Sequence, residues 1–529
     1  MLRLDPVYTD HMILQRDKEV RIAGLSAPDI EVKIYLDDEN VCLTRANDKG
    51  IFKAFMPAHS FDHERHSLKI ANDNEEIVLN DIYFGEVFLA NGQSNMELEL
   101  GNSAQADEAF ELINEDSSLA DNIRFYNVIK APYDSPEFDK AISENKWITM
   151  DDADATHSSA VAFFAALKIY EELNVPVGVV NMVKGGSSVT VWMDLETLAA
   201  SPDGQYYIDE YDKLVNGKTN EEYFEELEEY NKELDDYYAR EKEARDNALA
   251  EGRELSGSEL NDLIGPYPWP EPAGYCSPYR PAALNEYMFK NVINYTFNCV
   301  WYYQGEEDAL RHKHYKPLLT KYISYIRKYN DSKDLPVILL QLPVWADKCW
   351  EEGHEEGWTE IRKIQAELAD ELDNVHVIPL IDLGEFDNIH PVDKKTPGTR
   401  LANYTLGEIY KLEGYDVLPM KIAFANKEGR VVSVGFDNSY SGFLANVSEE
   451  GAEPKLVSAI DADIKGFKLA GEDMAFYDAD AFVQGGNIIL SSDKVLEPCF
   501  ISYGWANYIT CNLYNKAGIP LMPYCGKVH

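Results

Sequence analysis

The sequence predicts an α/β protein in which a parallel-sheet domain stands between β-rich domains at the two ends of the chain. Its 529 residues require more than one domain, because single cores stop growing at roughly 250–300 residues. Residues 1–80 and 414–529 contain the short, period-two apolar runs of antiparallel strands. Residues 81–413 instead alternate continuous apolar runs with helical segments, which is typical of a parallel sheet covered on both faces.

The first domain, residues 1–80, is predicted to be a small β-sandwich-like unit. Its apolar runs, such as EVRIAG and GIFKAFMP, are separated by Gly, Pro and Asn-Asp turns. His59, His63 and His66 lie in a polar loop of this domain. Histidine is a common metal ligand, but these three have no companion set of Cys or carboxylate residues, so we predict no metal site and no cofactor.

The central domain, residues 81–413, is predicted to form the parallel sheet. Its strand-like runs are VFLAN, NIRFYNVI, VPVGVVNM, FNCVWYY, PVILLQLPV and VHVIPLI, and SSAVAFFAALKIYEEL and YKPLLTKYISYIRKY have helical periodicity. Residues 205–275 form a strongly acidic insertion with Tyr, Phe and Leu at helical spacing. We expect a solvated helix that rests an aromatic stripe on the domain, and a lid or a subunit contact is the alternative.

The overall charge excludes some classes of partner. A formal net charge of -45 repels nucleic acid and anionic membrane surfaces, so we expect neither as a partner. Seven cysteines without a CxxC pair are typical of a reducing compartment, and the N-terminus lacks the pattern of a signal peptide. We therefore predict a cytoplasmic protein. The sequence leaves the oligomeric state open, and a homo-oligomer is compatible with it.

Ser94 is the first candidate for catalysis. It follows the apolar run DIYFGEVFLA at the expected carboxyl end of a strand, where open α/β sheets bind ligands. A serine at this place is also a common helix N-cap. Met96 stands where a Gly-x-Ser-x-Gly elbow would have its last glycine, so a standard α/β-hydrolase is not predicted.

His390 is the candidate base for Ser94. It lies in GEFDNIHPVDKK, soon after the last apolar strand, and Asp387 precedes it by three residues. In one turn the Asp387 carboxylate could hold Nδ1–H of the imidazole while Nε2 faces the serine. A structural role for a lone histidine remains the alternative.

Two further strand ends carry groups that suit acyl transfer. Gln304 follows the strand NCVWYY, and its amide is of the type that donates to a developing oxyanion. Glu306 could orient a neighbour or act as an alternative acid. Gly185 and Gly186 follow another strand and allow the backbone to approach a ligand closely. Four strand ends at one edge of one sheet therefore predict one site.

With these motifs in view, the chain resembles the sialate O-acetylesterase family of SGNH (GDSL-like) hydrolases. YTDHMILQR near the N-terminus and SYGWANYITCNLYNKAGIPLMPY near the C-terminus extend the resemblance over most of the chain except the insertion. The motifs that carry it are Gly92-Gln93-Ser94-Asn95-Met96, Gly185-Gly186-Ser187, Trp301-Tyr302-Tyr303-Gln304-Gly305-Glu306 and Asp387-x-x-His390-Pro391.

The resemblance implies a flavodoxin-like three-layer sandwich and a Ser-His-Asp mechanism without a metal. It makes Ser94 the nucleophile, His390 the base and then the acid, and Asp387 the orienting carboxylate. The oxyanion hole would combine the amides of Ser94 and Gly186 with the side chain of Gln304. The expected supporting residues are Gln93, Asn95, Gly185 and Glu306.

The resemblance leaves the substrate open, because the chain departs from the family at two segments that could line a pocket. Glu307-Asp308 replace the usual Ser/Ala-Asn, and ALNEYM at residues 283–288 replaces Leu-Tyr-Asn-Gly-Met. We expect an esterase that removes acetyl groups from O-acetylated mono- or oligosaccharides. The alternatives are an acetylesterase for neutral plant-type oligosaccharides (xylan, mannan or xyloglucan), a non-catalytic carbohydrate-binding protein, and a lipase or thioesterase on the same fold.

Overall fold

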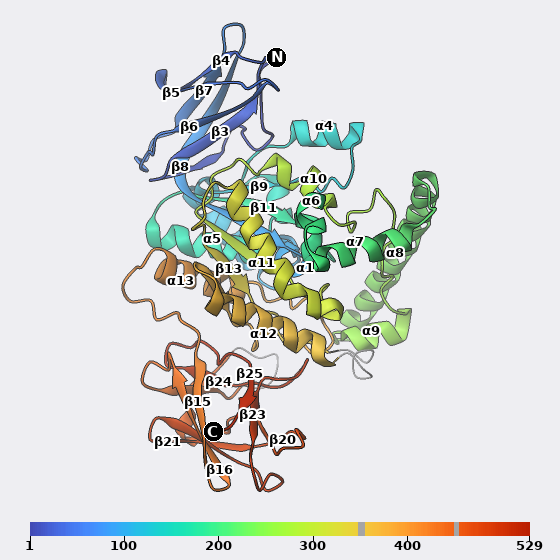
Figure 1. The fold of residues 1–529 in the computed structure, drawn as a ribbon, viewed down its shortest axis with the longest axis vertical. Coiled ribbons are helices and arrows are strands. Elements are labelled where there is room, and N and C mark those ends of the chain that lie inside the picture. The colour runs from blue at the N-terminus through green and yellow to red at the C-terminus, as the bar shows by residue number, and fades with distance from the viewer. Residues whose placement is uncertain (347–354, 449–453) are drawn as a thin grey trace.

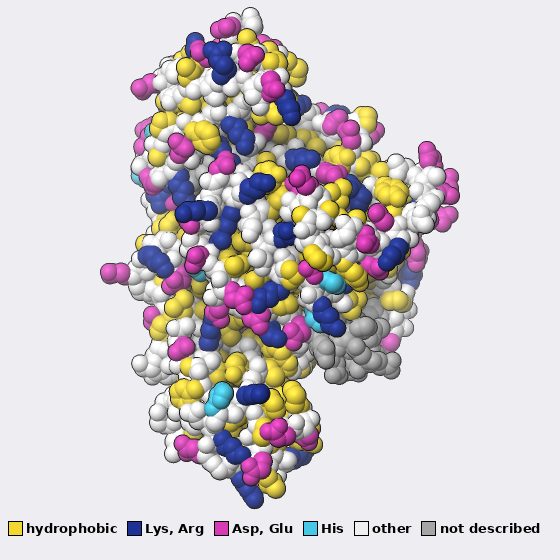
Figure 2. Space-filling view, in the orientation of Figure 1, with side chains coloured by type: hydrophobic (Ala, Val, Ile, Leu, Met, Phe, Trp, Pro, Cys, Tyr) yellow, Lys and Arg dark blue, Asp and Glu magenta, His cyan; other side chains and the backbone are white. Residues whose placement is uncertain are grey.

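The computed structural model describes residues 1–346, 355–448 and 454–529. An α/β region occupies the middle of the elongated molecule, between β-rich regions that hold the two chain ends (Figure 1). The prediction of an α/β protein with β-rich ends is confirmed. The visible face carries acidic and basic side chains interspersed with one another, despite the large negative net charge (Figure 2).

The N-terminal region is built from short antiparallel strands. One sheet has the order β1-β3-β6, and β4 pairs with both β5 and β7. Alternating burial along β6 and β7 puts one face of each strand into the core, as period-two sequences predict. The strands are β1 (Arg3–Leu4), β2 (Ile13–Gln15), β3 (Val20–Leu25), β4 (Glu31–Leu36), β5 (Glu39–Arg45), β6 (Ile51–Met56) and β7 (His66–Ala71).

Strand β8 (Glu76–Gly92) joins the N-terminal region to the central sheet without a break. Its first part pairs with β7, with Leu68 opposite Leu79, and its last residues pair with β11 and β12. The residues from 82 to 92 are all buried. The boundary predicted at residue 80 thus falls inside one strand, and the two regions share one hydrophobic core.

The central sheet has the strand order β10-β9-β11-β8-β12-β13-β14. All its neighbours are parallel except β10 and β9, so the sheet is mixed rather than purely parallel. Each of the predicted apolar runs of this domain contains a strand. Besides β8, these are β9 (Ile123–Asn127), β11 (Val177–Val183), β12 (Cys299–Tyr303), β13 (Val337–Leu340) and β14 (Val375–Ile378), and β10 (Ile148–Thr149) lies at the edge.

Long helices cover this sheet in pairs. Helix α5 (Ala160–Leu173) packs on α13 (Lys395–Tyr404), and α11 (His312–Tyr329) packs on α12 (Glu355–Glu371). Both helical sequences named in the sequence analysis form helices. The shorter helices of the region are α1 (Ser94–Glu97), α2 (Ala106–Glu115), α3 (Ser117–Asn122), α4 (Pro136–Glu144), α6 (Leu195–Ala199) and α10 (Ala283–Tyr287).

The acidic insertion is helical, and it projects from one side of the molecule (Figure 1). It consists of α7 (Pro202–Val215), α8 (Asn220–Ala250) and α9 (Gly257–Ile264). The aromatic stripe of α8 packs both on the insertion itself and, through Phe224, on Tyr133 of the central domain. The Tyr230 hydroxyl donates to Pro268 O at 2.9 Å, and the Tyr237 ring contacts that of Tyr267.

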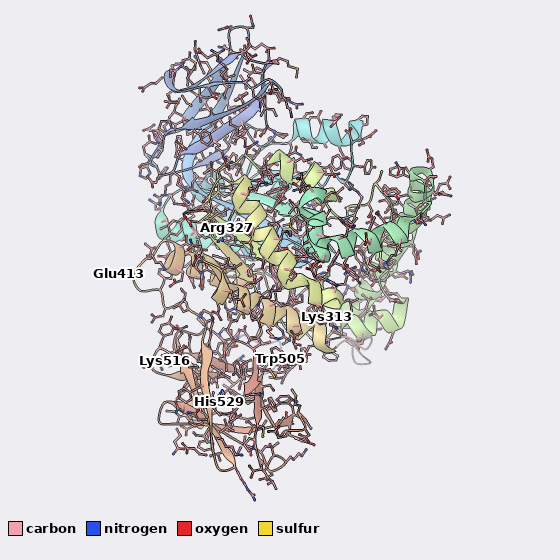
Figure 3. All side chains as sticks on the ribbon, in the orientation of Figure 1. Lys313, Arg327, Glu413, Trp505, Lys516 and His529 are labelled. Carbon is pink, nitrogen blue, oxygen red and sulfur yellow. The ribbon has the colours of Figure 1, made fainter. Side chains whose placement is uncertain are left out.

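The C-terminal region has its own hydrophobic core and antiparallel sheets of order β15-β16-β22-β21, β18-β17-β24 and β20-β19-β23-β25. It contacts the central region near Trp505, where Trp345 N–H donates to Asn507 O at 2.8 Å (Figure 3). Its strands are β15 (Lys421–Glu428), β16 (Val431–Asp437), β17 (Phe443–Asn446), β18 (Leu456–Ser458), β19 (Phe467–Ala470), β20 (Tyr477–Asp478), β21 (Asp480–Gln484), β22 (Asn487–Ser491), β23 (Phe500–Tyr503), β24 (Leu513–Asn515) and β25 (Tyr524–Lys527).

Within the described ranges, we find no helix that combines the length and the apolar character needed to cross a bilayer.

Candidate active site

Ser94 lies where β8 turns into α1, at the carboxyl end of a strand in the middle of the sheet. The turn requires Gly92, which has φ 144, and a Cβ at this residue would lie 2.1 Å from Tyr303 O. The next amide, that of Gln93, donates to the same carbonyl at 3.0 Å. Ser94 then begins α1 and is half-buried. This is the position at which open α/β sheets bind ligands.

His390 lies against Ser94, as the sequence predicts. Its Nε2 is 2.8 Å from Ser94 Oγ, although the two residues are 296 positions apart in the chain. The loop after β14 presents the ring, and Asn388 Oδ1 accepts a hydrogen bond from the His390 amide at 3.0 Å. A serine hydroxyl at this distance from an imidazole nitrogen has the geometry of an activated nucleophile.

The electrostatics of the site favour neutral His390. Desolvation of the ring, together with the positive charge of Lys394, lowers the pKa of His390, whereas the charge of Glu97 and the exposure of the residue to solvent oppose this shift. A neutral imidazole that faces a hydroxyl through Nε2 can accept its proton. The ring is therefore in the base form at neutral pH.

The Asp387 carboxylate lies elsewhere than predicted. Its Oδ2 accepts a hydrogen bond from the Ser258 amide at 2.8 Å, and Ser258 is in the first turn of α9. Burial opposes the shift, but the Ser258 N–H lowers the pKa of Asp387. The free N–H groups of a helix N-terminus attract a carboxylate. Within the described part of the chain, the His390 ring has one hydrogen-bond partner, Ser94, so Asp387 and His390 are not paired here.

Backbone amides beside Ser94 could form an oxyanion hole. A Cβ on Gly185 would lie 3.4 Å from Ser94 Cβ, and Gly186 has φ 66, which favours glycine. The Gly185 amide donates to Glu97 Oε2, which holds the loop against α1. Among the described residues, no protein acceptor takes the amide hydrogens of Ser94 and Gly186. Both amides are therefore available to a ligand.

The Gln304 side chain is fully buried and is committed to protein partners. Its Nε2 donates to Asp308 Oδ2 at 2.6 Å and to Ser187 O at 3.2 Å. Its Oε1 accepts from the hydroxyls of Tyr302 at 3.2 Å and Tyr315 at 3.1 Å. Both amide hydrogens are used, which differs from the predicted donation to an oxyanion. In this arrangement Gln304 supports the glycine loop through Ser187.

Three of the predicted supporting residues lie around the nucleophile. Gln93 Oε1 accepts hydrogen bonds from the amides of Gly305 and Glu307, both at 3.3 Å. Asn95 Nδ2 donates to Glu306 Oε1 at 2.7 Å. Burial raises the pKa of Glu306. These contacts fix the turn after β12 to the turn that carries Ser94.

Lys394 is a residue of the site that the sequence did not reveal. Its Nζ donates to Asn95 Oδ1 at 2.7 Å and its side chain is buried. Burial lowers the pKa of Lys394 to about 7, although the charge of Glu306 opposes this. Lysine is seldom buried, so its place four residues after His390 gave no signal.

The insertion also contributes residues that sequence reasoning missed. The Tyr207 hydroxyl of α7 donates to Asp308 Oδ1 at 2.6 Å, so the insertion is tied to the Gln304 segment. A Cβ on Gly186 would lie 2.4 Å from the Trp269 ring, which is 47% exposed. Trp269 meets Tyr279 edge to face at 5.3 Å, and Lys184 Nζ lies 5.1 Å from the Tyr279 ring. The only signal was the aromatic, Pro-rich composition of GPYPWPEPAGY.

Comparison with known proteins agrees with the motifs. Residues 282–406 match the family model of the carbohydrate esterase, sialic acid-specific acetylesterase. Sialate O-acetylesterases of Mus musculus and Rattus norvegicus are 27% and 24% identical to the chain over 132 residues. That stretch is 24% of this chain and 24% of each relative, so the chain spans about a quarter of the length of these curated relatives. The resemblance to the sialate O-acetylesterase family is confirmed.

The fold as a whole also has a known counterpart. The crystal structure of a carbohydrate acetylesterase from Xanthomonas citri is 23% identical and superposes with a TM-score of 0.71. The match covers 99% of this chain and 99% of that one, including both β-rich ends. The two proteins share their fold over the full length.

Proposed function

We propose that the protein is a serine esterase that removes O-acetyl groups from carbohydrates, as sialate O-acetylesterases do, and that its central sheet with its helix layers is an SGNH-hydrolase three-layer sandwich. The observation that carries this proposal is the 2.8 Å contact between Ser94 Oγ and His390 Nε2 at the end of β8. The family match of residues 282–406 supports the same reaction class.

The reaction proceeds as a two-step acyl transfer. His390 Nε2 takes the Ser94 proton while Ser94 Oγ forms a bond to the acetyl carbon. The amides of Ser94 and Gly186 donate to the oxyanion of the tetrahedral intermediate. The C–O bond to the sugar then breaks, and the sugar oxygen leaves with the proton from His390. A water molecule attacks the acetyl-serine by the reverse sequence, which releases acetate and restores Ser94.

In this mechanism the Asp387 carboxylate must move from its observed position to reach Nδ1–H of His390. It lies three residues before His390 on the same loop, and its carboxylate accepts the Ser258 amide in the observed arrangement. The N-terminus of α9 and Nδ1–H of His390 then compete for one carboxylate. Asp387 can orient His390 only when its hydrogen bond with the Ser258 amide of α9 is broken. The position of the insertion would therefore affect the rate of the reaction.

The mouth of the site suits a sugar ring. The half-exposed Trp269 ring lies beside Gly186 and meets the Tyr279 ring edge to face, and Lys184 lies over the Tyr279 ring. Aromatic faces pack on the apolar faces of sugars, and a lysine could pair with the carboxylate of a sialic acid despite the acidic chain. We therefore rank O-acetylated sialic acids first and neutral acetylated plant-type oligosaccharides second.

Substitution of the nucleophile tests the proposal directly. Ser94→Ala should reduce acetate release from a chromogenic acetyl ester to the background rate, with an unchanged circular-dichroism spectrum and melting temperature. Ser324→Ala is the matched control, since Ser324 is exposed on α11 and donates only to Thr320 O. Full activity of Ser94→Ala would refute the esterase mechanism and favour the carbohydrate-binding alternative.

A substrate panel separates the remaining alternatives. We expect kcat/KM to be highest for O-acetylated sialic acid and lower for acetylated xylo-, manno- and xyloglucan oligosaccharides. A reversed order would assign the enzyme to neutral sugars. A rate that grows with acyl chain length beyond acetyl would instead indicate a lipase or thioesterase.

A further inference from the structure

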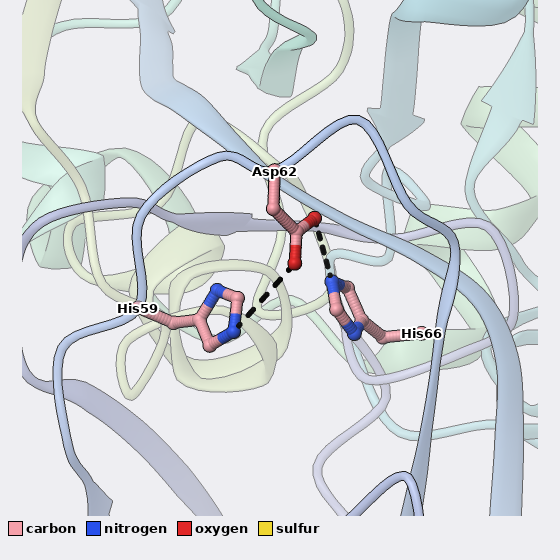
Figure 4. Close-up of side chains that lie close together, drawn as sticks. All are labelled: His59, Asp62 and His66. Atoms are coloured by element: carbon pink, nitrogen blue, oxygen red, sulfur yellow. Dashed lines mark hydrogen bonds and ion pairs between the residues drawn. The ribbon is translucent and has the colours of Figure 1, made fainter.

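Three side chains of the N-terminal region gather into a second polar cluster, remote from Ser94. His59, Asp62 and His66 each place one potential ligand atom within 4.8 Å of the others (Figure 4). They come from the segment that joins β6 to the start of β7. Of the predicted histidine loop, His63 stays outside the cluster, and Asp62 is the carboxylate companion that the sequence analysis did not find.

The Nδ1 atoms of both rings have acceptors that fix the tautomer. His59 Nδ1 lies 2.7 Å from Ser60 O, and His66 Nδ1 lies 2.6 Å from Asp37 Oδ2. A carbonyl oxygen and an ionised carboxylate accept but cannot donate, so each Nδ1 must carry the hydrogen.

The two Nε2 atoms therefore face Asp62 with lone pairs when the rings are neutral. His66 Nε2 is 3.2 Å from Asp62 Oδ1, and His59 Nε2 is 3.9 Å from Asp62 Oδ2. Three electron-pair donors that converge without a hydrogen between them repel one another. One divalent cation at their centre would satisfy all three.

The surroundings hold the two rings in place. Phe84 stacks on the His59 ring at 4.3 Å and meets the His66 ring edge to face at 5.3 Å. His66 is buried, whereas Asp62 is exposed and His59 is half-buried, so the cluster is open to solvent on one side. Side chains that are already held in place lose little conformational entropy when a metal binds.

We propose that His59, Asp62 and His66 bind a divalent transition metal, Zn²⁺ in preference to Mg²⁺, with water as the fourth ligand. Two imidazole nitrogens and one carboxylate are a common zinc donor set, whereas Mg²⁺ prefers oxygen ligands. Asp37 would serve as the outer carboxylate that orients His66, the arrangement that usually accompanies metal-bound histidine.

The metal would stabilise the fold rather than take part in the reaction. Phe84 and Gly92 are eight residues apart on β8, which corresponds to about 26 Å along an extended strand. The bound ion would tie the loop before β7 to Asp37, in the turn between β4 and β5. The rings of His59 and His66 lie against Phe84 of β8, the strand that leads to Ser94.

Titration of the chelator-treated full-length protein with ZnCl₂ tests the site. We expect binding at a 1:1 ratio in isothermal calorimetry, a higher melting temperature, and no comparable effect of MgCl₂. Asp62→Asn and His59→Ala should weaken Zn²⁺ binding at least about 100-fold, and Asp37→Asn about 10- to 100-fold. His63→Asn is the matched control, because His63 is exposed, has φ 67, and asparagine tolerates this backbone conformation.

These measurements can refute the proposed metal site while leaving the esterase proposal unaffected. Zn²⁺ affinity that is equal in wild type, Asp62→Asn and His63→Asn would overturn the site, and so would Zn²⁺ binding that does not change the melting temperature. Acetate release at 25 °C should be the same with and without Zn²⁺, and a metal-dependent rate would overturn the structural role. Ser94→Ala should bind Zn²⁺ as wild type does.

Discussion

Lys394 Nζ donates a 2.7 Å hydrogen bond to Oδ1 of Asn95, the residue that follows the proposed nucleophile. Asn95 Nδ2 in turn donates to Glu306 Oε1 at 2.7 Å, so the side-chain amide of Asn95 links the buried Lys394 amine to the buried Glu306 carboxyl group. The same cation lowers the pKa of His390. The network thereby couples the position of Ser94 to the protonation of its base.

The first prediction concerns the pH dependence of the wild-type rate. Because desolvation and Lys394 lower the pKa of His390, the base stays neutral at a lower pH than an ordinary histidine does. The acid limb of kcat/KM should therefore lie well below pH 6.5, the range of an ordinary histidine. Lys394→Met removes the positive charge and should move this limb to higher pH. Lys395→Met, whose lysine is exposed and paired with Glu108, should leave it in place. An unshifted limb in Lys394→Met would contradict the coupling.

The same pair of variants should differ in stability. Lys394→Met leaves the buried Asn95 Oδ1 without its hydrogen-bond donor, which costs about 1–3 kcal/mol. Lys395→Met should cost about 0–1 kcal/mol, since exposed ion pairs contribute little. Urea unfolding at pH 8 measures both free energies. Equal losses would show that the Lys394 network is not a main support of the fold.

The third prediction tests the competition for Asp387. Asp387→Asn should lower kcat on the order of 10⁴-fold if this carboxylate orients His390. Ser258→Pro removes the amide hydrogen that holds Asp387 at α9, and proline is tolerated in the first turn of a helix. We expect a higher kcat for this variant, whereas Ser258→Ala keeps the amide and should have the wild-type kcat. A mild effect of Asp387→Asn would make the carboxylate a support for α9 only.

The fourth prediction separates two roles of Gln304. Gln304→Leu removes the hydrogen bonds that this side chain makes with Asp308, Ser187 O and the hydroxyls of Tyr302 and Tyr315. Each buried group left without a partner costs about 1–3 kcal/mol, whereas the Tyr315 hydroxyl still donates to the main-chain oxygen of residue 304. We expect a lower melting temperature and a kcat loss smaller than the roughly 100- to 1000-fold of a direct oxyanion donor. Tyr315→Phe, which removes one of these hydrogen bonds, should show a weaker form of the same change. A large kcat loss at unchanged stability would restore Gln304 to the oxyanion hole.

The fifth prediction concerns the aromatic residues at the mouth of the site. Trp269→Ala should raise KM for an acetylated oligosaccharide about 5- to 10-fold, which corresponds to roughly 1–1.4 kcal/mol of lost ring contact. Trp269→Phe keeps a ring and should have a smaller effect. Neither variant should change the kinetics on a small chromogenic acetate. Equal effects on both substrates would mean that Trp269 only shapes the glycine loop.

The strands of the central sheet could be predicted because a buried parallel strand needs a continuous apolar run. Such a run can be recognised from the local sequence alone. The meeting of Ser94 with His390 could be predicted for a related reason. The carboxyl ends of parallel strands meet at one edge, so polar residues that follow successive strands must lie near one another.

The contacts of single side chains could not be predicted in this way. Whether Asp387 meets His390 or Ser258 depends on where the insertion folds back, and the local sequence carries no signal for that. The partners of Gln304 depend on Asp308, a position where the chain departs from the family that it resembles. His59 and His66 look like isolated loop residues until the fold brings their rings to Asp62 and Asp37.

Strand β8 has a consequence for how the molecule can be divided. A chain begun after residue 80 would lose β7 and the first residues of β8, and it would leave residues 83–85 of the strand without their partner β2. The loss would reach Ser94 through continuous backbone, because no turn separates the two halves of the strand. The N-terminal sheet is therefore not a detachable module: exchange or deletion of this sheet alters the strand that carries Ser94.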